Sequence, residues 1–257
     1  MAHAGRAAAI PGLRRNRQTR THAVTTTIPD LKANAAGAVL AIWTDIAPEL
    51  EADFNEWYWR EHLPERLAVP GFRCGRRYRA GAGAPRYFAC YELDSLDILD
   101  TPAYLERLDN PTDWTRRVMP GFRNTTRALV RVVTTLGRMS GAVALTVRVA
   151  PAEDRRADLE AHLRRTILPA LHARPGIVRL QHWQAEPMTA RSTIEAALRG
   201  GSDGTCDWVV IVEGTRPEDL KAIRDELVAA TSPLVAGMTR PPIDATYNLL
   251  CSLEAGP

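Results

Sequence analysis

Long hydrophobic runs and lysines are both scarce in this 257-residue chain. No apolar stretch approaches the roughly 18 residues that a transmembrane helix requires, so we expect a soluble, cytoplasmic protein with no membrane partner. Lys32 and Lys221 are the only lysines, and the other basic residues are scattered arginines, which is typical of a GC-rich bacterial genome. The four cysteines show no C-x-x-C spacing and lie mostly in apolar runs, which indicates buried thiols in a reducing compartment.

The sequence also lacks the motifs of several large enzyme classes. There is no G-x-S-x-G, no P-loop and no G-x-G-x-x-G after a predicted strand, which argues against serine-hydrolase and nucleotide chemistry. His162, His172 and His182 recur every ten residues, but they fall on a predicted helix and strand and match no zinc-binding spacing. We therefore expect no metal and no cofactor, and no feature points to haem.

The net charge of +3 divides unevenly along the chain. Residues 1–36 hold six of the 33 basic residues but a single acid, Asp30, whereas the body holds the other 27 basic residues and 29 acids. The slightly acidic body argues against a nucleic-acid partner. The first 36 residues carry no apolar period and no run long enough for a signal peptide, so we expect a disordered basic tail, although their composition also fits a transit peptide.

From residue 37 onward the chain repeats itself. The stretch LPERLAVPGFRCGRRYRA (63–80) aligns without a gap on LPALHARPGIVRLQHWQA (168–185), and the apolar periodicity around both predicts the order β-α-β-β-α-β. We expect a first repeat over 37–138 and a second over 139–257 that carries an insertion at 188–207. The repeat predicts an α+β fold made of two ferredoxin-like units.

The need to bury the apolar sheet faces determines how two such units combine. One unit has a four-stranded antiparallel sheet with two helices on one face, and its other face is apolar and uncovered. We expect the two sheets to pack face to face as a pseudo-dimeric α+β barrel with the helices outside. The pseudo-dimer would lie within one chain, and a further homodimer remains open.

In the first repeat an aromatic-rich predicted helix ends in an acid-histidine pair before a proline, and the next strand follows Pro-Gly. The residues of this pattern are Phe54, Trp57, Tyr58, Glu61, His62, Pro64, Pro70, Gly71, Phe72 and Tyr78. The pattern resembles that of the EthD-like group of dimeric α+β barrel proteins. The resemblance implies a fused version of a fold that serves cofactor-free isomerases, polyketide cyclases, dehydratases, decarboxylases, small monooxygenases, haem proteins and members of no known activity. The fold therefore does not choose the reaction.

Glu61 and His62 are the leading catalytic candidates. On a helical wheel, Glu61 lies in the face that should meet the sheet and His62 lies at its edge. Burial among aromatics would raise the pKa of a carboxyl, and a neighbouring imidazole titrates near neutral pH, so the two could divide proton donation and abstraction. In the structural alternative, His62 satisfies a carbonyl where Pro64 disrupts the helix, and Glu61 pairs with a nearby arginine. The nearby arginines are Arg60, Arg66 and Arg77.

The second repeat lacks the acid-histidine pair. Thr166 and Ile167 stand at the positions of Glu61 and His62, so we expect the site in the first repeat and a mainly structural second repeat. We assign His62 as base, Glu61 as its orienting group or the acid, and a third residue, Tyr78, as hydrogen-bond donor to the developing oxyanion. The expected substrate-binding residues are Trp43, Phe54, Trp57, Tyr58, Arg77 and Trp114.

These residues favour a cofactor-independent enzyme that moves a proton next to a carbonyl. It would be an isomerase, dehydratase or decarboxylase, hence a lyase or isomerase, and its partner would be a small aromatic or cyclic organic molecule held in an apolar pocket. One alternative is a non-catalytic protein that binds a hydrophobic ligand or serves in stress response. Another is a cofactor-free monooxygenase of a phenolic substrate.

Overall fold

The strands lie where apolar, β-branched and aromatic runs predict them. The computed structural model describes residues 1, 37–81, 85–187, 193–200, 203–229 and 231–256. The expected basic tail therefore lies outside the described residues. The strands are β1 (Ala38–Ile46), β2 (Phe72–Ala80), β3 (Tyr87–Leu93), β4 (Phe122–Leu136), β5 (Val143–Val149), β6 (Ile177–Ala185), β7 (Trp208–Gly214) and β8 (Ile243–Glu254).

The helices lie in the segments between the strands. The α-helices are α1 (Glu51–Trp57), α2 (Leu63–Leu67), α3 (Pro102–Asp109), α4 (Asp113–Val118), α5 (Arg156–His162), α6 (Leu168–His172), α7 (Ile194–Arg199) and α8 (Pro217–Val228). Short turns of 3₁₀-helix are η1 (Pro48–Leu50), η3 (Leu96–Asp100), η4 (Met119–Gly121) and η5 (Glu153–Arg155), and the π-helices are η2 (Tyr58–His62) and η6 (Leu163–Ile167). η3 and α3 are separated by Thr101, which is extended and caps α3 by accepting from the Tyr104 N–H.

The eight strands form one closed antiparallel barrel. Their order around it is β1-β3-β2-β8-β5-β7-β6-β4, so β2 pairs with β8 and β4 pairs with β6. We expected two separate sheets packed face to face, and this detail is corrected: the edge strands of the two halves are hydrogen-bonded to each other. Closure removes the unpaired backbone groups that free edges would leave. The description as two ferredoxin-like repeats stays a prediction.

Two long strands make the closure. β4 pairs with β1 through Phe122–Arg131 and with β6 through Val130–Leu136. In the same way, β8 pairs with β5 through Ile243–Asn248 and with β2 through Tyr247–Glu254. Each strand thus begins in one half of the barrel and ends against the other.

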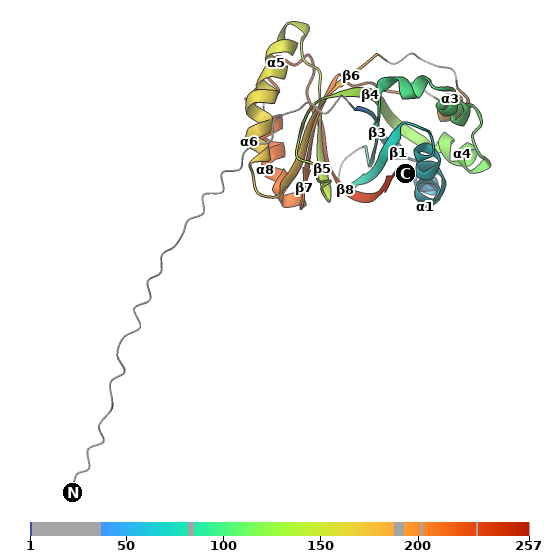
Figure 1. The fold of residues 1–257 in the computed structure, drawn as a ribbon, viewed down its shortest axis with the longest axis horizontal. Helices are drawn as coiled ribbons and strands as arrows, with labels where there is room; N and C mark the ends of the chain where they lie inside the picture. Colours follow the sequence, from blue (N-terminus) through green and yellow to red (C-terminus); the bar gives the residue numbers. More distant parts are fainter. Residues whose placement is uncertain (2–36, 82–84, 188–192, 201–202, 230, 257) are drawn as a thin grey trace. The chain divides into compact units, whose positions relative to one another are not determined.

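Alternating side chains divide the core into an interior cluster and two outer clusters. The interior cluster fills the barrel with residues of both halves, among them Trp43, Tyr78, Phe88, Trp183 and Tyr247. The first outer cluster lies under α1, α3 and α4, and the second lies under α5, α6 and α8. Figure 1 shows these two sets of helices beside different parts of the barrel wall.

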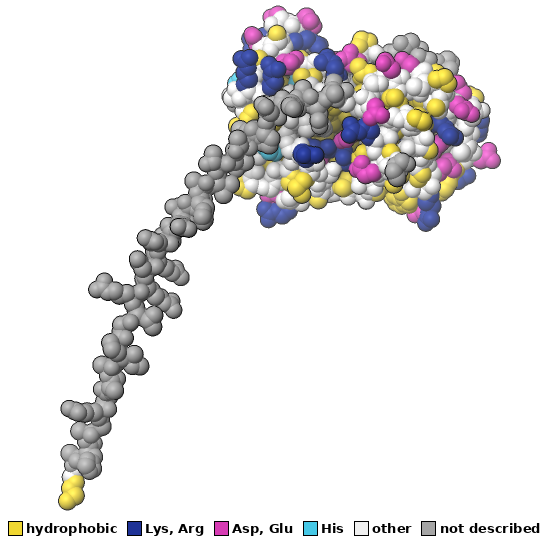
Figure 2. Space-filling view, in the orientation of Figure 1, with side chains coloured by type: hydrophobic (Ala, Val, Ile, Leu, Met, Phe, Trp, Pro, Cys, Tyr) yellow, Lys and Arg dark blue, Asp and Glu magenta, His cyan; other side chains and the backbone are white. Residues whose placement is uncertain are grey.

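The surface carries charges of both signs, and the thiols are free. Arginine, lysine and acidic side chains occur side by side on the face seen in Figure 2. Cys74, Cys90 and Cys206 are buried and free, and Cys251 is free and half-buried. Within the described ranges, no helix combines the length and the apolar character needed to span a membrane.

Candidate active site

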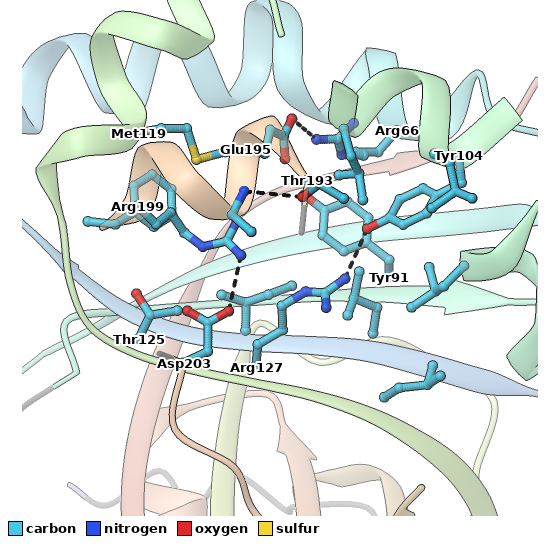
Figure 3. Close-up of a pocket in the computed structure, with 18 of the residues that line it drawn as sticks. Arg66, Tyr91, Tyr104, Met119, Thr125, Arg127, Thr193, Glu195, Arg199 and Asp203 are labelled. Atoms are coloured by element: carbon cyan, nitrogen blue, oxygen red, sulfur yellow. Dashed lines mark hydrogen bonds and ion pairs between the residues drawn. The ribbon is translucent and has the colours of Figure 1, made fainter. Parts of the chain in front are cut away.

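A cavity of about 410 Å³ lies in the first half of the barrel, between the strands and their covering helices. Strands β1, β3 and β4 supply one side, and η2, α2, η3, α3 and α7 supply the other (Figure 3). Its apolar lining is Leu40, Ile42, Leu96, Leu99, Leu105, Leu108, Met119, Phe122, Leu129, Pro187 and Ala196. Its polar lining is Tyr58, His62, Arg66, Tyr91, Asp100, Tyr104, Thr125, Arg127, Thr193, Glu195, Arg199, Asp203 and Thr205. A cavity wall that combines apolar side chains with converging polar groups is typical of a small-molecule site.

A π-helical turn brings His62 to this cavity. Pro64 has no N–H to continue the α-helical ladder, and the N–H of Leu63 reaches back five residues to the carbonyl of Tyr58. The second half has the same turn before the proline of its own Leu-Pro pair, Leu168-Pro169. The turn therefore belongs to the shared architecture, and the side chains mounted on it differ between the halves.

His62 is held neutral among aromatic rings. Its imidazole stacks on Trp57 with a centroid distance of 4.2 Å and meets Tyr58 edge-on at 5.1 Å. Its Nδ1 atom is buried without a hydrogen-bond partner in the part of the chain that the structure describes. Burial, followed by the positive charges of Arg66, Arg77 and Arg199, lowers the pKa of His62 well below its ordinary value. At neutral pH the ring is therefore uncharged.

Two tyrosines beside His62 form a hydroxyl pair. The Tyr91 hydroxyl donates to the Tyr58 hydroxyl at 3.4 Å, which leaves the hydrogen of Tyr58 for another acceptor. Burial raises the pKa of both phenols, so they stay protonated at neutral pH. Both line the cavity, where Tyr58 can donate to an oxygen of a bound molecule.

Charged groups of the cavity are paired across elements, as Figure 3 shows. Arg66 of α2 donates to Glu195 of α7, and each side chain is only 3% exposed. Arg199 pairs with Asp203 at 3.1 Å. Arg127 of β4 donates to the Tyr104 hydroxyl at 3.0 Å.

Glu61 does not face His62. Its carboxylate accepts hydrogen bonds from the hydroxyls of Thr112 and Thr115, which belong to the start of α4, and it does not line the cavity. The α-helical wheel placed Glu61 toward the sheet, and the π turn is the physical reason for the difference, because its extra residue rotates the side chains that follow. The expected pairing with an arginine is also not seen among the described residues, since the partners of Glu61 are threonines.

Tyr78 lies on the other side of the barrel wall. Its ring is fully buried in the interior cluster and stacks on Phe88 at 5.4 Å. Its neighbour Arg77 points to the opposite face, as strand alternation predicts. The structure therefore does not bring Tyr78 to His62, and the hydroxyl next to His62 is that of Tyr58.

The expected substrate-binding residues are spread over three environments. Trp43 is in the interior cluster, where its indole donates to Thr146 at 3.2 Å. Arg77 is fully buried in the first outer cluster and donates to Asn55 at 2.8 Å, with its guanidinium over the ring of Tyr58. Tyr58 is the member of the expected set that lines the cavity. The full expected set was Trp43, Phe54, Trp57, Tyr58, Arg77 and Trp114.

The other three expected aromatics pack around the helix that carries His62. Phe54 and Trp57 are fully buried in the first outer cluster, and Trp57 donates to Thr115 at 3.1 Å. Trp114 is half-buried and donates to Asp53 at 2.9 Å. These side chains fix α1 and α4 and so support the cavity from behind.

The sequence reasoning missed the contribution of the insertion. Thr193, Glu195 and Arg199 of α7, with Asp203 after it, belong to the chain's second half and line the cavity of the first. The second half therefore supplies part of the cavity wall. The one available signal was the insertion itself, because it interrupts the second repeat soon after the stretch 168–185, which aligns without a gap on 63–80.

In the described segments, no group of three or more His, Cys, Asp or Glu side chains is arranged to hold a metal ion. His162 and His172 are half-buried on the helical layer of the second half. His182 is fully buried on β6, where its ring lies 4.7 Å from that of Trp208.

Comparison with known proteins identifies the fold and not a family. No protein-family model matches the sequence, and no curated protein matches it. An anthrone oxidase-like protein of known structure is similar over 86% of this chain and 94% of its own, with a TM-score of 0.60 and 15% identity. Monooxygenase-like proteins from Fusobacterium nucleatum and Lactobacillus acidophilus match with TM-scores of 0.54 and 0.52 and 9% identity, each over 86% of this chain and at least 96% of their own.

The chain is thus an α+β protein whose described strands form a closed eight-stranded antiparallel barrel, and it shares its fold with these structures. The similarity to each of these structures covers 86% of the chain. Membership of a fused EthD-like group stays a prediction.

Proposed function

We propose that the protein is a cofactor-independent small-molecule enzyme in which neutral His62 removes a proton from an aromatic or cyclic substrate. The observation that carries the proposal is a buried, uncharged imidazole in the wall of a largely apolar cavity. A general base must be unprotonated and within reach of its substrate, and His62 meets the first requirement at any pH near neutrality.

The tyrosine pair supplies the second part of the chemistry. Removal of a proton next to a carbonyl, or from a phenol, leaves negative charge on oxygen. The Tyr58 hydroxyl, which accepts from Tyr91, is placed to donate to that oxygen and so to stabilise the anion. Isomerisation, dehydration and decarboxylation all use such an anion, and the residues do not choose among them.

A second candidate reaction is cofactor-free oxygenation. The similarity in fold to an anthrone oxidase-like protein and to two monooxygenase-like proteins favours this reaction. The deprotonated substrate would supply the electrons: a ring-flanked methylene group and O₂ give a carbonyl group and water. His62 and Tyr58 would have the same roles as in the first candidate.

The test begins with a thermal-shift screen of phenols, lactones and cyclic ketones, because a bound ligand stabilises the native state. Turnover of the compounds found is then measured for wild type, His62→Gln and a control, His162→Gln, which changes a histidine outside the cavity. We expect His62→Gln to lose about 100-fold or more in kcat, the usual range for a general base, while ligand binding and the control's turnover are retained. Oxygen uptake in step with turnover identifies the second candidate. Unchanged turnover in His62→Gln would refute the proposal, and tight binding without turnover in wild type would identify a binding protein.

A further inference from the structure

The insertion in the second half is fastened to the first half at both ends. Near its start, the N–H of Ile194 donates to Asp109 at 3.3 Å, and Leu198 of α7 packs against the first outer cluster. After α7, Gly204 donates to the carbonyl of Thr125 at 2.8 Å, and its own carbonyl accepts from Arg127 at 3.0 Å. We call the described part of this segment, 193–200 and 203–205, the strap.

The strap changes the charge of the cavity. Without it, the cavity would be lined by two arginines, Arg66 and Arg127, and one acid, Asp100. The strap adds one arginine and two acids, so that three arginines and three acids line the cavity and their formal charges cancel.

Glu195 is the member of the strap that pairs with Arg66, the most deeply buried of the arginines that line the cavity. Arg66 and Glu195 are each 3% exposed, and the second carboxylate near Arg66, that of Glu65, is 3.7 Å away. The Nη1 atom of Arg66 has no hydrogen-bond partner among the described residues, but an incoming carboxylate or phosphate there would lie on a guanidinium already neutralised by Glu195, with Glu65 also nearby. Displacing Glu195 instead would leave a buried carboxylate without its partner. A neutral molecule incurs no such cost.

We propose that Glu195 sets the ligand class of the cavity, which is a neutral aromatic or cyclic molecule bearing hydroxyl or carbonyl oxygen and no anionic group. This inference rests on the proposed function, because it names the substrate class of the same cavity. It makes Glu195 a specificity-determining residue that acts through Arg66. Removing its charge frees Arg66 to bind an anion.

The test compares two probes with the same ring system, neutral 2-naphthol and anionic 2-naphthoate, whose affinities are measured by calorimetry at pH 7.5 with the full-length protein. We expect wild type to bind naphthol at least about tenfold more tightly than naphthoate, and Glu195→Gln to gain about tenfold or more for naphthoate with little change for naphthol. Glu186→Gln is the matched control, because Glu186 pairs with Arg131 at 2.9 Å outside the cavity. It should behave as wild type.

The double variant Arg66→Met/Glu195→Leu guards against a folding defect, since it removes both charges together. It should keep the wild-type preference for naphthol. Tighter binding of naphthoate by wild type, no gain in Glu195→Gln, or failure of both probes to bind would each overturn the proposal. The readout is binding alone, so a His62→Gln enzyme with undiminished turnover would refute the proposed function and leave the charge selection standing.

Discussion

Two buried histidines are uncharged for the same reason and differ in their surroundings. His62 lines a cavity, whereas His182 does not line it and contacts Trp208. Burial, followed by the charge of Arg131, lowers the pKa of His182 to about 3, and both of its ring nitrogens lack partners among the described residues. An imidazole without a partner inside the protein costs stability whenever the unfolded chain can protonate it.

The pH dependence of stability should reveal His182. Its folded pKa is below the unfolded value of about 6.5, so between these two values the unfolded state binds the extra proton. The free energy of unfolding should therefore fall as pH falls below about 6.5, by up to about 1.4 kcal/mol per pH unit. In His182→Leu this contribution is absent, and urea unfolding from pH 7 to pH 4 should show a shallower loss. Parallel curves for the two proteins would contradict the burial of a neutral imidazole.

Glu61 should stabilise the start of α4. Its carboxylate binds the two threonine hydroxyls of α4 and should help to hold that helix without taking part in proton transfer. Glu61→Gln should thus reduce stability by about 1 kcal/mol and leave kcat within a factor of three, because an amide oxygen still accepts the hydroxyls. A loss of kcat as large as that of His62→Gln would restore Glu61 to the catalytic machinery.

At the level of elements, the π turn and α7 decide where the site lies. Strand ranges could be predicted because β-branched and aromatic runs bounded by Pro-Gly or Gly-rich turns leave little choice. The direction in which His62 points could not be predicted from the sequence. An α-helical wheel assumes a constant 3.6 residues per turn, and the π turn after Trp57 departs from that value. Nor could the sequence show that α7 covers the other half, since periodicity carries no information on long-range packing.

The docking of α7 can be measured through its buried ion pair. Glu195→Leu leaves the buried guanidinium of Arg66 without its main partner and should cost about 3–5 kcal/mol of unfolding free energy. Arg66→Met should cost a similar amount, and the double variant should be less damaged than the sum of the two. Denaturant unfolding of the four proteins completes the cycle. Strictly additive losses would mean that the two side chains do not interact.

Across the whole molecule, the two halves share their backbone pairing and a charge network. Arg179 of the second half contacts Glu213 at 2.6 Å and Glu92 of the first half at 2.9 Å, and Glu92 also pairs with Arg76. The repeat in the sequence predicted two related halves and an apolar interface. It did not predict shared strands or buried charges, because β4 and β8 show their double pairing only in three dimensions.

The closed barrel should unfold as one unit. Tryptophans lie in both halves, so their fluorescence and the far-UV circular dichroism should follow one coincident transition. Arg179→Met leaves the buried Glu213 without its arginine and should lower the free energy of unfolding by about 3–5 kcal/mol. Two separated transitions in wild type would contradict a barrel closed through both halves.

The most direct test of the account is proton removal itself. Exchange of an acidic C–H for deuterium in D₂O is followed by NMR on a neutral cyclic ketone that wild type binds, such as 2-tetralone. We predict that wild type accelerates the exchange, that His162→Gln matches it, and that His62→Gln loses about 100-fold or more of the acceleration. Equal acceleration by wild type and His62→Gln, or none by wild type, would contradict the role of His62 as the base.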